Sequence, residues 1–354
     1  MRTRATMRHM SKRPLILSAA ALAPGPWPTL DPFLFCVHHH DAYPEGTPEQ
    51  GLAPQHLQGR DLGQDFSGQN GFSTYHGHPV PGFPAHPHRG FETVTVTRAG
   101  MIDHSDSMGA TARYGEGDVQ WLTAGAGIQH CEMFPLRHTD RANPAELFQI
   151  WLNLDARYKM ATPHFSMFWA EDIPRVSHTD GQGKTTEVVV VAGLLHGTQA
   201  LPAPPESWAS REGSDVAIYT VRMEAGAQWT LPAASGANTR RMVYFFLGET
   251  MRLGAQEADR HCALEVDATQ DCPLQAGSTA CEVLVLQGRP IAEPVAQYGP
   301  FVMNTRAEIE QAFADYRRTE FGGWPWGRPD PVHPASQGRF ARRPDGSVET
   351  PYPL

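Results

Sequence analysis

Two short stretches decide the fold of this chain: HPHRGFETVTV, residues 86–96, and HCE, residues 130–132. In an extended strand successive side chains point to opposite faces, so His86 and His88 share one face of the first stretch. The same alternation places His130 and Glu132 on one face of the second stretch. If the two strands are neighbours in a barrel, three imidazoles and a carboxylate meet inside it. This donor set suits a divalent first-row metal and leaves coordination positions open for substrate or oxygen.

The metal interpretation rests on this spacing rather than on any one histidine. The chain has 17 histidines, and an isolated one is more commonly a surface residue or a satisfied core residue than a ligand. Here an HxH pair precedes the alternating Val94 and Val96, and an HxE pair follows on a second strand, which together favour a metal site. Alternation also places Glu92 on the face of His88. The strand pattern alone therefore does not choose between Glu92 and Glu132 as the carboxylate ligand.

Longer motifs surround both stretches. The run HPHRGFETVTVTRAG, residues 86–100, is followed by GDVQWLTAGAGIQHCEMFP, residues 117–135. Together they closely resemble the pirin family of the cupin superfamily, whose members include quercetin 2,3-dioxygenase-like proteins. Similar segments extend along most of the chain: DPFLF at 31–35, IWLNL at 150–154 and GPFVMNTRAEIEQAFADY at 299–316. The resemblance implies an all-β protein of two cupin-type antiparallel β-barrels, a bicupin, with a C-terminal α-helix.

The resemblance also implies a metal, usually iron, in the N-terminal barrel only. By position, the implied ligands are His86, His88, His130 and Glu132, with Fe(II) or another divalent first-row ion as the cofactor. It favours Glu132 over Glu92 as the carboxylate ligand. Glu92 is then a group behind the ligands that could orient a histidine ring.

The leading functional hypothesis is a metal-dependent dioxygenase that acts on a flavonol of the quercetin type, or on a related enol or phenolic substrate, together with dioxygen. In this hypothesis Glu132 is the catalytic residue that takes the substrate proton, and apolar residues around Phe91 and Trp121 could wall the pocket. Pirin relatives also include regulators, so the alternative is an iron-dependent redox-sensing adaptor that binds a partner protein. A third hypothesis, another cupin reaction such as isomerisation, would proceed without oxygen consumption.

Strand rhythm and turn signals divide the chain into four parts. Residues 1–160 are expected to form the N-terminal barrel with the metal site, and residues 161–180 a linker. Residues 181–300 should form the C-terminal barrel, and residues 301–354 a helix and an irregular tail.

The second barrel is expected to lack a metal site. When Gly100 is set against Gly248, the strand patterns of the two halves superimpose. Positions 86, 88 and 92 then correspond to Ala234, Gly236 and Arg240. These residues offer no imidazole or carboxylate, so we expect the second barrel to serve for packing or as a partner surface.

The clearest helix follows Thr305. Thr305 can cap the first turn, and Glu308 three residues later completes a capping box. An apolar stripe on one face should dock on a barrel, because it is costly to expose: Ile309, Ala312, Phe313 and Tyr316. Gly322 and Gly323 would end the helix.

Composition and charge narrow the class of protein. A net charge of −9 over 354 residues argues against direct nucleic-acid binding, which usually needs a basic face. The five cysteines have no CxxC spacing, which is typical of a reducing compartment rather than of a disulfide framework. No apolar run is long enough to cross a membrane. The basic N-terminus and the apolar run at 15–22 lack a persuasive cleavage region, so we interpret them as an extended tail and a first strand and expect a cytoplasmic protein.

The sequence also predicts the structure of three other segments. The trio HHH, residues 38–40, is interpreted as a polar turn, because consecutive strand residues cannot all face one metal. Residues 46–84 should form a long loop that borders the mouth of the metal barrel, and its His76 and His78 are not expected to be ligands. Residues 158–176 should connect the two halves.

Overall fold

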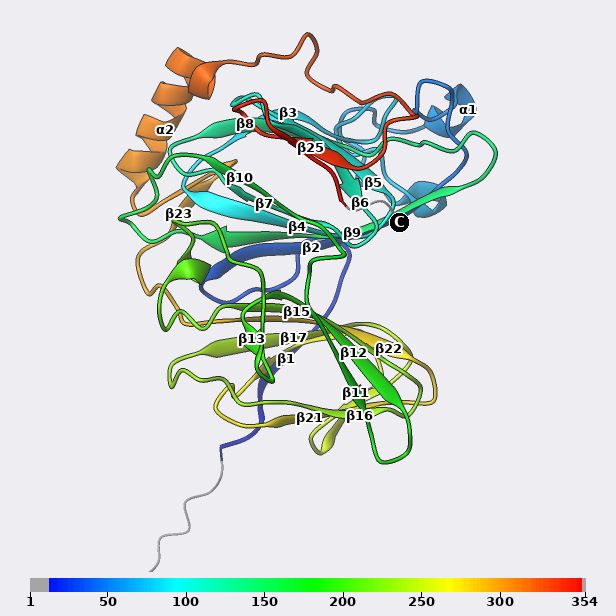
Figure 1. The fold of residues 1–354 in the computed structure, drawn as a ribbon, viewed down its shortest axis with the longest axis vertical. Helices are drawn as coiled ribbons and strands as arrows, with labels where there is room; N and C mark the ends of the chain where they lie inside the picture. The colour runs from blue at the N-terminus through cyan, green and yellow to red at the C-terminus, as the bar shows by residue number, and fades with distance from the viewer. Residues whose placement is uncertain (1–12, 352–354) are drawn as a thin grey trace, which may run out of the picture.

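The computed structural model describes residues 13–351. The main strands form four antiparallel sheets, which follow one another as layers along the long axis of the molecule (Figure 1). Each half of the molecule consists of two of these layers with a core between them. The basic residues of the expected N-terminal tail, up to Lys12, lie outside the described residues.

The first half carries a five-stranded and a six-stranded sheet. The five-stranded sheet has the order β10-β7-β4-β9-β2, with the bounds β2 (Phe33–Tyr43), β4 (Phe91–Ala99), β7 (Val119–Thr123), β9 (Asn143–Asn153) and β10 (His164–Phe168). The six-stranded sheet has the order β26-β25-β6-β5-β8-β3, with the bounds β3 (Gly82–His88), β5 (Met101–Asp106), β6 (Thr111–Gly115), β8 (Ile128–Met133), β25 (Phe340–Arg342) and β26 (Val348–Glu349). β2 and β3 are edge strands.

The second half repeats this plan with a seven-stranded and a four-stranded sheet. The seven-stranded sheet has the order β1-β20-β17-β22-β15-β12-β11, with the bounds β1 (Ile16–Ala21), β11 (Arg175–Thr179), β12 (Thr185–Ala192), β15 (Ala217–Met223), β17 (Arg240–Leu247), β20 (Cys262–Val266) and β22 (Cys281–Gly288). The four-stranded sheet has the order β16-β21-β18-β19, with the bounds β16 (Gln228–Leu231), β18 (Met251–Leu253), β19 (Gln256–Ala258) and β21 (Cys272–Ala276). A small hairpin, β13 (Leu194–Leu195) and β14 (Thr198–Gln199), and a 3-10 turn, η2 (Trp208–Ser210), complete this half.

A shared core joins the two halves. Val94 and Val96 of β4 point toward the second half, where they belong to the same buried apolar cluster as Met242 and Tyr244 of β17. Thr95, which lies between the two valines, points the other way into the first half. Burial of each large apolar side chain contributes about 1.5–3 kcal/mol, so this cluster holds the five-stranded and seven-stranded sheets together.

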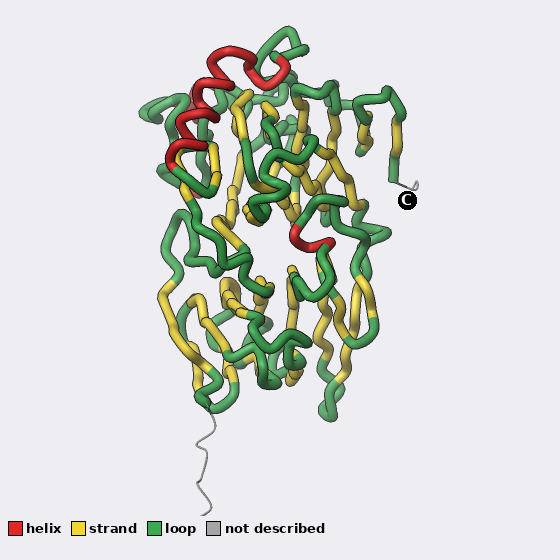
Figure 2. Tube along the Cα trace, turned by 90° about the vertical axis from the view of Figure 1, so that its left-hand side faces the viewer, coloured by secondary structure: helices red, strands yellow, loops and turns green. Residues whose placement is uncertain are grey.

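After the second half the chain returns to the first. A hairpin, β23 (Ala296–Tyr298) and β24 (Phe301–Met303), leads into α2 (Arg306–Thr319), which lies along the outside of the first half (Figure 1 and Figure 2). No described helix is long and apolar enough to span a membrane.

The ends of α2 follow the sequence prediction closely. Thr305 and Glu308 form the predicted capping box. Ile309 and Ala312 are buried in a cluster with Phe301, and the other two residues of the predicted stripe are partly buried beside them. The helix ends at Thr319, just before the predicted glycines, and a 3-10 turn, η3 (Glu320–Gly322), follows.

The predicted fold class, all-β with two cupin-type halves and a C-terminal helix, is confirmed. The halves differ from closed barrels, because in each of them the two sheets share no strand pairing and form an open sandwich. Gly100 and Gly248 occupy equivalent places, after β4 and β17, with φ of 78° and 115°. This agrees with the predicted superposition of the halves.

Strand pairing departs from the expected boundaries at three places. The apolar run at 15–22 forms a strand, β1, but β1 pairs with β20 of the second half. β10 lies within the expected linker and pairs with β7 of the first half. The tail that we expected to be irregular contains β25, which pairs with β6. These are short strands at or near sheet edges, and their partners are distant in sequence, so local periodicity does not reveal their pairing.

Two loop predictions have different outcomes. Residues 38–40 do not form a turn but continue β2, paired with β9. His39 is buried, whereas His38 and His40 stack on the opposite face with ring centroids 5.8 Å apart. The predicted long loop is largely irregular up to residue 81, with only α1 (Pro54–Leu57) and η1 (Gln69–Gly71) within it, and β3 begins at its end.

Candidate metal centre

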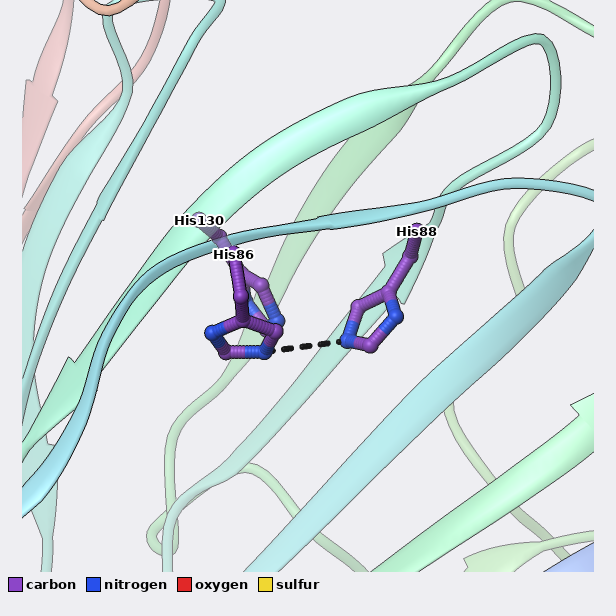
Figure 3. A group of neighbouring side chains, drawn as sticks. All are labelled: His86, His88 and His130. Carbon is purple, nitrogen blue, oxygen red and sulfur yellow. Dashed lines mark hydrogen bonds between the residues drawn. The ribbon is translucent and has the colours of Figure 1, made fainter. Parts of the chain in front are cut away.

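The two metal half-motifs lie on paired strands. β3 and β8 run antiparallel, with His86 opposite His130. A bulge between Phe83 and His86 resets the alternation of β3, so Phe83, His86 and His88 all face the same cavity. One ring nitrogen from each of His86, His88 and His130 lies within 4.8 Å of the others (Figure 3). The predicted convergence of the three histidines therefore occurs.

Backbone carbonyls orient two of these rings. Nδ1 of His86 lies 2.8 Å from the carbonyl oxygen of Pro84, and Nδ1 of His88 lies 3.4 Å from that of Pro300. A carbonyl only accepts hydrogen bonds, so each Nδ1 carries the hydrogen and each Nε2 presents a lone pair. The two Nε2 atoms lie 3.1 Å apart, joined by the dashed line in Figure 3.

The surroundings of His130 show whether a metal fits between the three histidines. Its ring is fully buried, and neither of its nitrogens has a hydrogen-bond partner among the described residues. Burial lowers the pKa of His86 to about 4 and those of His88 and His130 well below the usual range, and neighbouring histidines add to this effect. The rings are therefore neutral near pH 7. Unpaired buried nitrogens are costly, and three converging neutral imidazoles fit a divalent first-row metal.

Glu132 lies in the same cavity but outside the three-histidine cluster. Its carboxylate accepts a hydrogen bond from the Thr95 hydroxyl at 2.9 Å and one from the Gln149 amide at 3.4 Å. Burial raises the pKa of Glu132, although the neighbouring His104 and these hydrogen bonds oppose the rise. A carboxylate held in this way is placed to hold a proton or to approach a metal at the cluster.

Glu92 points away from the histidines. The chain turns at Gly90, whose φ is 86°, and the strands on either side of this turn belong to different sheets. The alternation counted from His88 does not continue to Glu92, so the expectation that they share a face is wrong. The Glu92 carboxylate instead accepts hydrogen bonds from Thr123 at 2.7 Å and from Ser207 of the second half at 2.5 Å. These contacts give it no direct hold on a histidine ring.

A cavity of about 660 Å³ opens beside the histidine cluster. The edge strands β2 and β3 both line it, and the predicted loop at its mouth contributes Phe66 and His76. His76 and His78 are not part of the three-histidine cluster. The remaining aromatic walls are Phe35, Phe83 and Trp151. The volume is in the range of small-molecule sites.

The two expected wall residues have different positions. The Phe91 ring lies beside the ring of His88, with centroids 5.1 Å apart, and packs on Trp151 at 4.4 Å. It therefore backs the cavity wall. Trp121 belongs to the core between the halves, so it does not wall the pocket. The alternation of β7 turns it away from the histidine cluster.

Sequence reasoning missed His104. This residue lies opposite Glu132 in the β5 and β8 pair, and its ring centroid is 5.5 Å from that of His130. Its Nε2 lies 3.2 Å from the Asp106 carboxylate. The spacing His-Ser-Asp at 104–106 was the available signal, since alternate residues of a strand share a face. His104 and Asp106 thus form a buried polar pair beside the three-histidine cluster.

Comparison with known proteins agrees with this geometry. Residues 52–152 match the family Pirin, and residues 218–322 match the Pirin C-terminal cupin domain. A pirin-like protein of Caulobacter vibrioides is 37% identical over 240 residues, which cover 68% of this chain and 80% of that protein. This chain belongs to the pirin family. Pirin of Homo sapiens is 32% identical to it over 257 residues, which cover 71% of this chain and 81% of the human protein.

A solved structure shares the fold of most of this pirin. The crystal structure of quercetin 2,3-dioxygenase from Acinetobacter baumannii matches with a TM-score of 0.66 and 25% identity, over 87% of this chain and 98% of that chain. The first family match contains the three histidines and Glu132, and the second runs from within β15 of the second half to α2. Within residues 13–351, the histidine cluster of the first half is the one group of this kind that could hold a metal.

Proposed function

We propose that this pirin is a metal-dependent dioxygenase that acts on a flavonol of the quercetin type or on a related enol or phenolic compound. We further propose Fe(II), or another divalent first-row ion, as the cofactor, with the ligands His86, His88, His130 and Glu132. The observation that carries the proposal is the cavity of about 660 Å³ beside the histidine cluster. Its aromatic walls suit a flat ring system, and the similarity to a quercetin 2,3-dioxygenase supports the substrate class.

The residues of the cavity would have different roles in the reaction. When bound, the metal would supply Lewis-acid and redox chemistry at the histidine cluster. Phe83 and Trp151 would hold the ring of the substrate and exclude water. Glu132 would take the proton of the substrate hydroxyl on a carboxylate oxygen, while the hydrogen bonds from Thr95 and Gln149 keep that carboxylate in place.

Oxygen uptake on addition of quercetin tests the proposal. The protein is purified anaerobically, its metal content is measured by mass spectrometry, and uptake is followed with an oxygen electrode. We expect uptake in proportion to bound metal, and none in His88→Ala. His40→Ala is the matched control, because His40 is exposed on β2, and it should behave as the wild type. Stoichiometric metal without uptake for any of a panel of flavonols would reject the dioxygenase.

The redox-sensing adaptor finds less support. Such a protein needs a redox-responsive surface, whereas it has no need of a cavity large enough for an aromatic ligand. Cys131, behind two of the proposed ligands, is buried beside Val80 and Met133, and burial raises the pKa of its thiol, which disfavours the reactive thiolate. The five cysteines are all free and buried, which supports the cytoplasmic location that we propose.

A further inference from the structure

A chain of three buried polar residues ends at the wall of the cavity. The Tyr75 hydroxyl donates a hydrogen bond of 2.7 Å to the Asp41 carboxylate, and Nδ1 of His39 lies 2.8 Å from the same hydroxyl oxygen. All three side chains are buried, and His39 lines the cavity together with His86 and His88. The proposed ligands and the proposed proton acceptor use none of the three.

The direction of these hydrogen bonds determines the tautomer of His39. Asp41 also accepts a hydrogen bond of 2.8 Å from the backbone N–H of Ser73, so it is held as an acceptor. Burial raises the pKa of Asp41 to about 6, which leaves it ionised at pH 8. Tyr75 has one hydroxyl hydrogen and gives it to Asp41, so Nδ1 of His39 must carry a hydrogen and donate to Tyr75. Nε2 of the neutral ring then holds a lone pair.

This lone pair has no hydrogen-bond partner within the chain. Among the described residues Nε2 of His39 makes no hydrogen bond, although the residue is only 8% exposed. Its neighbours are aromatic: the ring of Phe83 lies 5.8 Å away and that of Phe134 lies 6.4 Å away, centroid to centroid. An oriented acceptor in an apolar wall is a feature of sites that recognise a ligand hydroxyl.

The backbone of Tyr75 indicates that the arrangement is held in place. Its φ is 58°, a conformation that bulky residues rarely adopt. Two backbone hydrogen bonds with Asp65, of 2.9 Å and 2.8 Å, lock this conformation. Such conformations persist where the surrounding structure imposes them, and they are concentrated at ligand sites.

We propose that His39 accepts a hydrogen bond, through Nε2, from a hydroxyl of a phenolic ligand in the cavity. His39 is then a residue that determines specificity, and Tyr75 and Asp41 are positioning residues that set its tautomer. The inference rests on the proposed function, which supplies the ligand class, and adds which wall residue selects ligands by their hydroxyl pattern. It concerns a hydroxyl other than the one that faces the histidine cluster.

Anaerobic binding of flavonols to the metal-loaded full chain at pH 8 tests this assignment. The probes are quercetin and analogues that each lack one or two of its hydroxyls, such as 3,5,7-trihydroxyflavone, and affinities come from titration calorimetry. In the wild type, loss of the hydroxyl that reaches His39 should weaken binding roughly 5- to 10-fold. In His39→Phe, which keeps a flat ring but no acceptor, that difference should disappear. His76→Phe, on the same wall, is the control and should retain it.

Tyr75→Phe separates positioning from packing. It keeps the ring and the strained backbone but removes the hydroxyl that orders the tautomer, so it should reduce the discrimination between analogues while leaving metal content unchanged. If His39→Phe does not fold, Tyr75→Phe can replace it in the test of discrimination between the analogues.

Three results would overturn the inference. The first is that His39→Phe still discriminates between quercetin and its analogues as the wild type does. The second is that His39→Phe loses affinity equally for all of these compounds, which would make His39 a wall residue only. The third is the absence of binding of any flavonol to the wild type, which would remove the ligand class. Failure of oxygen uptake alone, with discrimination intact, would reject the dioxygenase and leave this inference standing.

Discussion

The Nε2 atoms of His86 and His88 lie 3.1 Å apart inside the first half of this pirin. Both rings turn Nδ1 toward a carbonyl oxygen, so both Nε2 atoms present lone pairs to each other. Two acceptors at this distance repel unless a proton or a cation lies between them. The lowered pKa of both rings disfavours a proton near pH 7. A bound cation is therefore the partner that this arrangement favours.

We expect added metal to stabilise the folded protein. At a free metal concentration 100 times the Kd, binding stabilises the native state by about 2.7 kcal/mol. Anaerobic Fe(II) should therefore raise the Tm of the metal-free protein by several degrees in scanning calorimetry, and a chelator should reverse the rise. His86→Ala should remove this response, whereas His40→Ala should retain it. The same Tm with and without saturating metal in the wild type would contradict the ligand assignment.

Substitution of the two buried glutamates should distinguish their roles. Glu132 lies in the cavity, whereas Glu92 binds Thr123 and Ser207 on the opposite face. Loss of a group that only orients a ligand typically costs about 10- to 100-fold in metal affinity. We expect Glu132→Gln to lose more than this and Glu92→Gln to lose less than about 10-fold, measured by chelator competition. Similar losses in both variants would show that Glu132 is not a ligand.

The stability of the protein should depend on pH through Glu92. Burial raises the pKa of this carboxyl from its ordinary 4.5 to about 7. Between these two values the folded state holds a proton that the unfolded chain has released, so the stability that this group contributes falls as the pH rises through that window. The shift corresponds to about 3 kcal/mol.

The comparison with Glu92→Gln isolates this contribution, because glutamine stays neutral and the other titrating groups are common to both proteins. We expect the wild type to lose about 3 kcal/mol relative to the variant between pH 4.5 and 8, in urea unfolding at a series of pH values. Parallel stability curves for the two proteins would mean that Glu92 titrates normally in the folded state.

A buried ion pair anchors the C-terminal segment to the first half. Arg113 of β6 donates to both carboxylate oxygens of Asp103, at 2.6 Å and 2.7 Å, and to the backbone carbonyl oxygens of His333, Pro334 and Gln337. Arg113→Met leaves the buried Asp103 carboxylate without its charged partner. We expect it to lower the free energy of unfolding by about 3–5 kcal/mol in urea titration.

Two further variants control for this effect. Arg306→Met removes a surface ion pair with Glu310 on α2 and should change the stability by less than about 1 kcal/mol. The double variant Arg113→Met, Asp103→Leu should recover part of the loss, because it removes the unpaired charge. If the double variant were as unstable as Arg113→Met alone, the loss would come from the carbonyl contacts instead.

Patterns within single strands and turns predicted the parts of the site that depend on neighbouring residues. The HxH spacing placed His86 and His88 together, and the HxE spacing placed His130 and Glu132 on one face, because side chains alternate along any strand. The capping box of Thr305 and Glu308 was predictable for the same reason, since it lies within one helical turn. The sequence by itself therefore determined which residues could meet and which elements carry them.

The tertiary structure decided what faces each of those elements. Glu92 lies on the far side of its sheet because the turn at Gly90 sends β3 and β4 into different sheets. His39 acquires its oriented lone pair from Tyr75, 36 positions away, and Pro300 holds the His88 ring from 212 positions away. Hydrogen bonds of this kind form between segments that only the packed sheets bring together, so no local periodicity records them.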